Sequence, residues 1–246
     1  MKYHLKNKVV WLTGASKGIG YHLATALIQA GAQLIVSARD TSVIADMPAS
    51  DHIDCDVTNA EDVKRAVERI VAKHGGLDCI ILNAGNAEYV NTKRFDSAVY
   101  ERMMAVNFTS QVYAVEACLP HLRNSFSPYI VAMSSSVAWT GLSRGHAYSA
   151  SKAASRNFFQ GLALDLARED IPVSVICPGF VRTPLTDKND FNMPGLIEPE
   201  TAAKHIMNGM QSMKPEISFP KRFTIPFRLI TILPARLRFA LLKRIL

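Results

Sequence analysis

The 246-residue sequence has few of the features that mark membrane, secreted or metal-binding proteins. No run of about 18 uncharged apolar residues occurs, so we expect no helix that spans a bilayer. The polar residues 1–8 lead directly into an apolar run, and no signal peptide is visible. The only cysteines are Cys55, Cys79, Cys118 and Cys177, which show neither CxxC nor metal-ligand spacing. We expect no metal site, and buried thiols in a reducing cytoplasm.

Acidic residues are missing from the C-terminal stretch 217–246. This stretch carries seven lysines and arginines, which equals the net charge of +7 for the whole chain, so residues 1–216 are neutral overall. No repeat, linker or low-complexity segment divides the rest, and 48% hydrophobic with 20% charged residues is typical of a globular protein. The sequence predicts one domain over residues 1–220, followed by a basic, apolar extension over residues 221–246.

A short apolar run near the N-terminus is followed by a glycine-rich turn. Residues 9–12 (VVWL) have the character of a buried parallel strand, and residues 13–20 read TGASKGIG before a helical pattern that runs to about Ala30. In such a strand, turn and helix, backbone N–H groups at the helix N-terminus can bind a pyrophosphate. Glycines at positions 14, 18 and 20 would let phosphate oxygens approach the backbone closely. We therefore predict a nucleotide site here.

Apolar runs alternate with helical patterns along the rest of the domain. We predict further strands at residues 33–37, 52–54, 79–82, 129–133, 171–177 and 216–219. Asn59 is expected to cap a helix that ends at His74, and a single helical turn should lie between Asp40 and Asp51. This alternation predicts an α/β fold with a doubly wound parallel sheet and helices on both faces.

The end of the predicted second strand bears on the choice of nucleotide. Dinucleotide sites commonly have an acidic residue there for the ribose 2′-hydroxyl. This chain instead has Ala38 followed by Arg39, with Lys17 in the glycine turn. Two cations without a carboxylate favour a 2′-phosphate, and hence NADP over NAD. The alternative is that Arg39 is a solvated loop residue.

Tyr148 and Lys152 are four residues apart at the start of a long amphipathic segment, so they share one helix face. An ammonium beside a phenol favours the phenolate, and we expect it to lower the tyrosine pKa for proton transfer. A simple surface pair is the alternative. Ser134, Ser135 and Ser136 follow the 129–133 strand, where a hydroxyl could bind a substrate oxygen or cap a turn. Asn107 interrupts the apolar periodicity of residues 96–124, so its amide should bond a specific partner.

Four motifs together resemble the short-chain dehydrogenase/reductase family over roughly residues 6–220. They are Thr13-Gly14-x-x-x-Gly18-x-Gly20, Asn83-Ala84-Gly85, Tyr148-x-x-x-Lys152 and Pro178-Gly179. The resemblance implies a single Rossmann-type domain that transfers hydride between NAD(P) and a carbonyl or alcohol. It assigns catalysis to Asn107, Ser135, Tyr148 and Lys152, with Ser136 as the alternative to Ser135.

The resemblance also implies cofactor contacts and assembly. It places Asp56 and Val57 beside the adenine, Asn83 and Gly85 near its ribose, and Val181 and Thr183 at the nicotinamide carboxamide. The full set of implied cofactor residues is Gly14, Ser16, Lys17, Gly18, Ile19, Gly20, Arg39, Asp56, Val57, Asn83, Ala84, Gly85, Tyr148, Lys152, Pro178, Gly179, Val181 and Thr183. The helices that carry Asn107 and Tyr148 would pair in a homodimer or homotetramer. A catalytically silent NAD(P)-binding sensor or scaffold is the rival interpretation, although the intact catalytic set argues against it.

Residues 185–199 are predicted to select the substrate, by the same resemblance. Phe191 and Met193, together with Trp139, Leu142, Tyr89 and Val90, would line an apolar pocket for a bulky apolar or acyl carbonyl. The same side chains would serve equally well to pack down a lid.

The extension is apolar over residues 223–233, and Pro226 and Pro234 are expected to break it. Residues 236–246 mix apolar side chains with four cations that do not gather on one helix face. Peripheral contact with an anionic membrane is one interpretation. Packing on the body or on a partner subunit is the other. We expect no nucleic-acid binding, since no nucleic-acid motif accompanies the charge.

Overall fold

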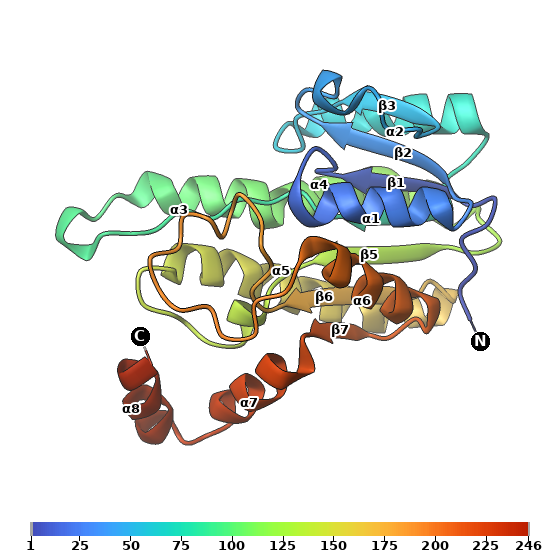
Figure 1. Ribbon diagram of the computed structural model, residues 1–246. Coiled ribbons are helices and arrows are strands. Elements are labelled where there is room, and N and C mark those ends of the chain that lie inside the picture. Colours follow the sequence, from blue (N-terminus) through green and yellow to red (C-terminus); the bar gives the residue numbers. More distant parts are fainter. Residues whose placement is uncertain (1, 246) are drawn as a thin grey trace.

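Seven parallel strands form one sheet in the order β3-β2-β1-β4-β5-β6-β7 (Figure 1). This computed structural model describes residues 2–245, and side chains as far as residue 243. The strands are β1 Val9–Thr13, β2 Gln33–Ala38, β3 Asp51–Asp54, β4 Cys79–Leu82, β5 Tyr129–Met133, β6 Val173–Pro178 and β7 Glu216–Phe219. The prediction of a single doubly wound parallel sheet is confirmed.

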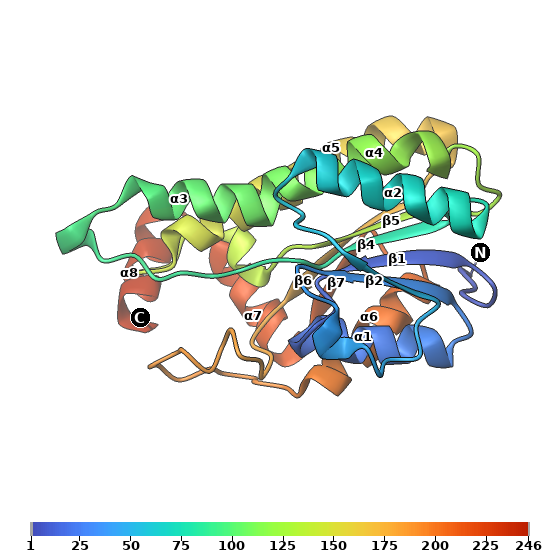
Figure 2. The ribbon, with the colours of Figure 1, turned by 90° about the horizontal axis from the view of Figure 1, so that it is seen from above.

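Helices cover both faces of the sheet, as the view from above shows (Figure 2). The helices are α1 Gly18–Gln29, α2 Ala60–His74, α3 Ser97–Met104, α4 Ser110–Leu122, α5 His146–Leu166, α6 Pro199–Gln211, α7 Lys221–Thr231 and α8 Ala235–Ile245. Helices α1 and α6 pack on one face and α2, α4 and α5 on the other, each over its own apolar core. All four cysteines are buried free thiols, including the one that lies outside the apolar runs, Cys55.

Capping residues explain where α2 begins and ends, and a proline explains where β6 begins. The Asn59 side chain accepts hydrogen bonds from the N–H groups of Glu61 and Asp62, which fixes the start of α2. Gly75 ends α2 in the left-handed conformation, with φ of 78°. Strand β6 begins at Val173 rather than at residue 171, and Pro172 has no N–H with which to extend the ladder.

The long segment 96–124, in which apolar residues recur at helical spacing, forms two helices joined by one π-helical turn, called the π-turn below. Helix α3 ends at Met104, residues Ala105–Thr109 form the π-turn, and α4 follows. A π-turn inserts an extra residue into the helix and so re-aims the side chains around it. Asn107 lies within this turn and is fully buried.

The C-terminal extension differs from the expectation at one proline. Pro226 lies inside α7 and does not break it, whereas Pro234 does separate α7 from α8. A proline here removes one backbone hydrogen bond, and packing of α7 against the body outweighs that loss: the ring of Phe223 lies 5.3 Å from that of Phe180. Leu246 and the side chain of Arg244 lie outside the described residues. No helix within residues 2–245 is long and apolar enough to cross a membrane.

Candidate active site

The predicted site residues gather at the carboxyl ends of the central strands. Gly14 follows β1, Asn83 follows β4, Ser134 follows β5 and Gly179 follows β6. Strands β1 and β4 are neighbours at the point where the strand order reverses direction. Open α/β sheets bind ligands at such a switch point. Four segments that are distant in sequence therefore meet at one edge of the sheet.

The turn between β1 and α1 has the geometry of a phosphate cradle. Gly14 and Gly18 have φ of 69° and 57°, which favour glycine. A Cβ atom on Gly20 would lie 2.1 Å from the Gly14 carbonyl oxygen, so only glycine fits there. Lys17 at the N-cap of α1 makes no side-chain cap hydrogen bond, and the first helical turn has no acidic residue. The first N–H groups of α1 are thus available to anionic oxygens, and the turn fits a dinucleotide pyrophosphate.

The Asn83-Ala84-Gly85 motif packs directly against this turn. The Asn83 amide donates to the carbonyls of Thr13 (3.1 Å) and Gly14 (2.9 Å). In return, the Thr13 hydroxyl accepts the N–H groups of Asn83 and Ala84. The side chain of Asn83 therefore locks the glycine turn. Ser16 and Ile19 are partly buried in the same turn.

The residues expected to select the nucleotide lie beyond β2 and β3. Ala38 is buried at the end of β2, while Arg39 and Lys17 are exposed. Asp56 accepts hydrogen bonds from the side chain and backbone of Thr58, and these lower its pKa, with a smaller contribution from the charge of Arg39. Arg39 is thus close enough to Asp56 to act on it. The next residue, Val57, is partly buried against the core beneath α2.

The four predicted catalytic residues come from three segments. Tyr148 and Lys152 lie on α5, and the Lys152 ammonium is 5.9 Å from the centroid of the Tyr148 ring. That ammonium is buried and donates a 2.9 Å hydrogen bond to the carbonyl of Met133, the last residue of β5. Ser135 is the N-cap of the short helix Ser136–Trp139, and its hydroxyl accepts the N–H of Val137 at 3.3 Å.

Asn107 lies in the π-turn, and its side chain makes three hydrogen bonds to oxygen and nitrogen partners and a weaker one to the Met103 sulfur. Its amide nitrogen donates to the Asn86 carbonyl (2.8 Å) and to the Ser151 hydroxyl (3.0 Å), and its oxygen accepts the Asn86 N–H (2.9 Å). The expectation that this amide bonds specific partners is confirmed. A Cβ atom on Gly85 would lie 2.9 Å from the Asn107 oxygen and 3.2 Å from the Lys152 ammonium. Gly85 therefore brings these two side chains into one site.

Burial is the main influence on the pKa values of Lys152 and Tyr148. It lowers the pKa of Lys152 to about 8. Burial also raises the pKa of Tyr148 above its ordinary value, and a hydrogen bond with Ser135 acts in the opposite direction. Burial therefore outweighs the lowering of the Tyr148 pKa that we expected from Lys152, whose ammonium bonds the Met133 carbonyl. The phenol is protonated at neutral pH and can give a proton.

The last predicted cofactor residues follow β6. Thr183 lies against the glycine turn, because a Cβ atom on Gly18 would be 3.1 Å from its methyl group. Val181 is buried and forms an isolated bridge to Ile197. The Gly179 N–H donates to the Phe219 carbonyl at 2.7 Å. Pro178, the last residue of β6, is buried beside it.

An aromatic cluster lies next to these residues. Its members are Tyr89, Trp139, Phe180, Phe191, Phe223 and Phe227. Successive ring centroids are 5.3–6.5 Å apart. The structure brings Tyr89, Trp139 and Phe191 together as expected, but Val90 belongs to a separate small core with Met103. Met193 is not among the stacked rings, and its sulfur accepts a 3.1 Å hydrogen bond from the Asn189 amide. Leu142 is partly buried.

Several functional contacts were not predicted. Phe180, Phe223 and Phe227 complete the aromatic cluster, two of them from α7. The Ser134 hydroxyl donates to the Lys152 carbonyl at 2.8 Å and joins the end of β5 to α5. Ser151 lies inside the Tyr-x-x-x-Lys motif, and this proximity was the one signal in the sequence that pointed to it. The others depend on contacts between segments distant in the chain.

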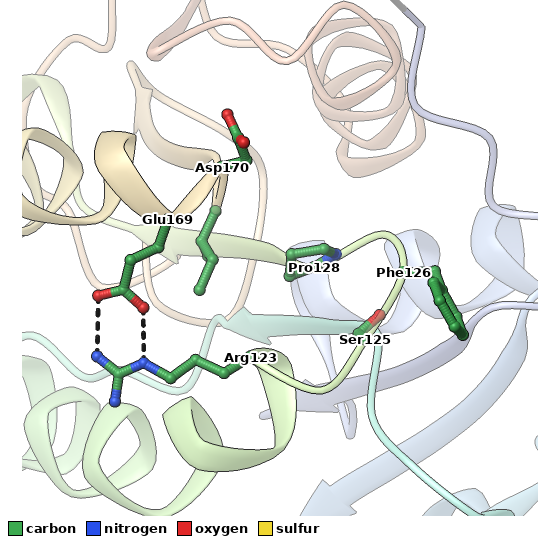
Figure 3. A pocket seen from close by; sticks show the side chains of 7 residues that line it. Arg123, Ser125, Phe126, Pro128, Glu169 and Asp170 are labelled. Carbon is green, nitrogen blue, oxygen red and sulfur yellow. Dashed lines mark hydrogen bonds and ion pairs between the residues drawn. The ribbon is translucent and has the colours of Figure 1, made fainter.

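A surface hollow of about 440 Å³ lies elsewhere, at the amino ends of β5 and β6 (Figure 3). It is crossed by the ion pair of Arg123 and Glu169, with N–O distances of 2.6 and 2.9 Å. Phe126 and Asp170 stand at its rim. This edge of the sheet is opposite to the one that carries Tyr148, so the hollow is not part of the site.

Comparison with known proteins agrees with this geometry. The family model described as short chain dehydrogenase matches residues 8–193. The chain belongs to the short-chain dehydrogenase family. An uncharacterized oxidoreductase of Myxococcus xanthus is 31% identical over 95% of this chain and 96% of its own length. The 11-beta-hydroxysteroid dehydrogenase-like 4A of Arabidopsis thaliana is 33% identical over 94% of this chain and 82% of its own.

A solved structure shares the fold over nearly the whole chain. It is a short-chain dehydrogenase of Burkholderia cenocepacia in complex with NADP, with a TM-score of 0.86, 25% identity and 99% of each chain covered. The expected family and fold are confirmed. This short-chain dehydrogenase is thus an oxidoreductase of a family that binds NAD(P).

Proposed function

We propose that this short-chain dehydrogenase uses NADPH to reduce a carbonyl compound to a secondary alcohol. The observation that carries the proposal is the meeting of Tyr148, Lys152, Ser135 and Asn107 beside a phosphate-binding turn. A sensor or scaffold would have no need for such a buried proton-transfer group.

The proposed role of each side chain follows from its protonation state and its contacts. Tyr148, protonated at neutral pH, would give its proton to the carbonyl oxygen. Ser135 would hold that oxygen, and the Lys152 ammonium would stabilise the phenolate left behind. A bound nicotinamide would supply the hydride. Asn107 would position the site through its bonds to Asn86 and Ser151, and proton transfer of this kind contributes about 10²- to 10⁴-fold.

The preference for NADP rests on charge at the end of β2. Arg39 and Lys17 are exposed, and Ala38 stands where a carboxylate would repel a 2′-phosphate. Arg39 can meet a phosphate through two parallel N–H donors. That the Burkholderia relative is in complex with NADP supports the same choice.

The substrate proposal rests on the aromatic cluster. The six rings, of which Phe223 lies against Gly179, favour a bulky apolar carbonyl over a sugar or small acid, because apolar and aromatic walls bind apolar groups. The name of the Arabidopsis relative, a hydroxysteroid dehydrogenase-like protein, is consistent with a ligand of this type.

We also propose a homodimer or homotetramer formed through α4 and α5. Leu164 of α5 is 78% exposed, which suits a contact between copies. Light scattering on the purified protein would give the mass. A cytoplasmic location stays a prediction.

The first experiment is a fluorescence titration with NADPH and, separately, with NADH. We expect tight binding of NADPH and weak binding of NADH, and Arg39→Asp should reverse this order. Arg168→Asp is the matched control, since Arg168 is an exposed arginine in the short helix Ala167–Glu169 that follows α5, away from the end of β2. Equal binding of both nucleotides would overturn the NADP assignment, and binding of neither would favour a non-catalytic role.

The second experiment tests the proton donor. Tyr148→Phe should abolish NADPH-dependent carbonyl reduction while NADPH affinity stays within a few-fold of the unchanged protein. Retained turnover in this variant would remove Tyr148 from its proposed role.

A further inference from the structure

Exposed apolar side chains gather on the two C-terminal helices. Six of the thirteen exposed large hydrophobic residues of the described chain lie within residues 225–241, on these helices or, for Ile232, directly after α7: Ile225, Leu229, Ile232, Leu237, Phe239 and Leu241. Figure 1 shows α8 beyond α7, set apart from the sheet. Single exposed apolar residues are ordinary on a protein surface, but a concentration of them indicates a binding surface.

Helix α7 has two apolar faces with different partners. Its inner face carries Phe223 and Phe227, which belong to the aromatic cluster. Ile225, Leu229 and Ile232 follow one another at spacings of four and three residues, so they form a stripe on the opposite face. These three side chains are 55%, 58% and 74% exposed.

The orientation of α7 is fixed by contacts with the body. Arg228 pairs with Glu216 of β7, and its guanidinium lies 5.3 Å from the centroid of the Trp139 ring. Glu216 in turn pairs with Arg156 of the catalytic helix α5 at 2.8 Å. The outer stripe is therefore held outward and cannot turn into the body without breaking these contacts.

The charge around the stripe indicates what covers it. Exposed cations flank it at Lys221 and Arg222, and further ones follow at Arg236 and Lys243. Residues 217–246 contain no acidic side chain. If two copies of this surface met, cations would face cations with no acid from either tail to pair with them. An anionic lipid surface offers both the apolar layer and the opposite charge.

We propose that α7 and α8 form a docking surface for membranes rich in anionic phospholipid. Ile225, Leu229 and Ile232 enter the interface, and the surrounding cations meet the headgroups. The contact is peripheral, since no described helix can span a bilayer. In this orientation the backbone of α7 separates the lipid from Phe223 and Phe227, and therefore from the aromatic cluster.

Binding of the full chain to vesicles tests the proposal without any substrate. The protein is sedimented with vesicles of phosphatidylcholine alone, or of phosphatidylcholine mixed with phosphatidylserine. We expect binding to the mixed vesicles only, weakening as salt is added. Replacement of the stripe by Ile225→Ser, Leu229→Ser and Ile232→Ser should abolish it. The matched control, Val43→Ser with Phe126→Ser, removes exposed apolar side chains elsewhere and should bind normally.

A second variant tests the charge while leaving the apolar stripe intact. Lys221→Gln, Arg236→Gln and Lys243→Gln should weaken binding on the order of 100-fold, at roughly fivefold for each cation. The control replaces Lys2, Lys64 and Lys204, which are exposed lysines outside the tail, by Gln. Its affinity should equal that of the unchanged protein.

Three results would overturn the proposal. They are failure of the unchanged protein to bind the mixed vesicles, equal binding to phosphatidylcholine alone, and normal binding by the stripe variant. A fourth comes from light scattering without lipid: if the stripe variant has a lower mass than the unchanged protein, the surface binds a second copy instead. An unchanged mass together with lost vesicle binding supports the lipid surface.

Discussion

The ammonium of Lys152 donates a 2.9 Å hydrogen bond to the carbonyl of Met133, which joins α5 to the end of β5. Both groups are buried, and this arrangement places a cation in a medium that disfavours charge. The position of the lysine therefore has consequences for both activity and stability.

Activity should depend on pH through Lys152. Burial lowers its pKa to about 8, so the ammonium is present below that pH and lost above it. Carbonyl reduction should fall as pH rises through about 8, approaching about tenfold per pH unit. Initial rates at saturating NADPH would measure this. Lys152→Arg keeps its charge throughout, and in this variant the fall near pH 8 should disappear. An unchanged rate across this range would show that the ammonium is not required.

The same burial should cost stability at neutral pH. Folding lowers the pKa of Lys152 from 10.5 to about 8, so the cost is full below pH 8, shrinks as pH rises toward 10.5, and is absent above it. Lys152→Met should therefore raise the free energy of unfolding at pH 7, by at most about 3 kcal/mol. The Met133 carbonyl keeps a donor, because the Gln111 amide lies 3.2 Å away. Urea unfolding at pH 7 and at pH 10 measures the effect, and a gain that does not shrink with pH would contradict it.

The sheet could be predicted from the sequence because its strands are buried on both faces. Strands β4 and β5 begin and end at the predicted residues, since each is one uninterrupted apolar run bounded by polar residues or, at the start of β5, by Pro128. The glycine turn was predictable for a similar reason: positive φ at Gly14 and Gly18 restricts the residue type. Such constraints act within a few residues and leave a local pattern.

Contacts between distant segments left no such pattern. Lys152 binds the backbone carbonyl of Met133. Every residue has such a carbonyl, so no residue type in the sequence marks this contact. Asn107 was visible as a polar interruption of the apolar periodicity, but the π-turn around it was not, because a single extra residue changes the spacing little. Pro226 predicted a break that packing of Phe223 and Phe227 overrides. The part of α7 in the aromatic cluster could therefore be found only in the folded chain.

Gly85 should be needed for the alignment of Asn107 and Lys152. A Cβ atom there would lie 2.9 Å from the Asn107 oxygen and 3.2 Å from the Lys152 ammonium. The contact with the Asn107 oxygen is the shorter one, so in Gly85→Ala the Asn107 amide or the backbone at position 85 must shift, and the Lys152 ammonium must give way by a few tenths of an ångström. We expect the kcat for carbonyl reduction to fall about 10²-fold, as misplacement by about 1 Å can do. Gly141→Ala is the control, because no atom lies within 4 Å of its added Cβ. Normal kcat in Gly85→Ala would mean that the site adapts.

Gly179 should be required for a different reason, which is the approach of α7. A Cβ atom on Gly179 would lie 2.6 Å from Cδ1 of Phe223, so Gly179→Ala must displace that ring. Overpacking of this kind costs about 1–3 kcal/mol of unfolding free energy. Gly161→Ala, in open space on α5, should instead be neutral or stabilising.

A double-mutant cycle separates the ring contact from any other effect of Gly179→Ala. In a Phe223→Ala background the added methyl group has room, so Gly179→Ala should cost less than about 0.5 kcal/mol there. Urea unfolding of the four proteins gives the coupling between the two positions. If Gly179→Ala costs the same in both backgrounds, the strain lies in the backbone, whose Gly179 N–H bonds the Phe219 carbonyl, and not against α7.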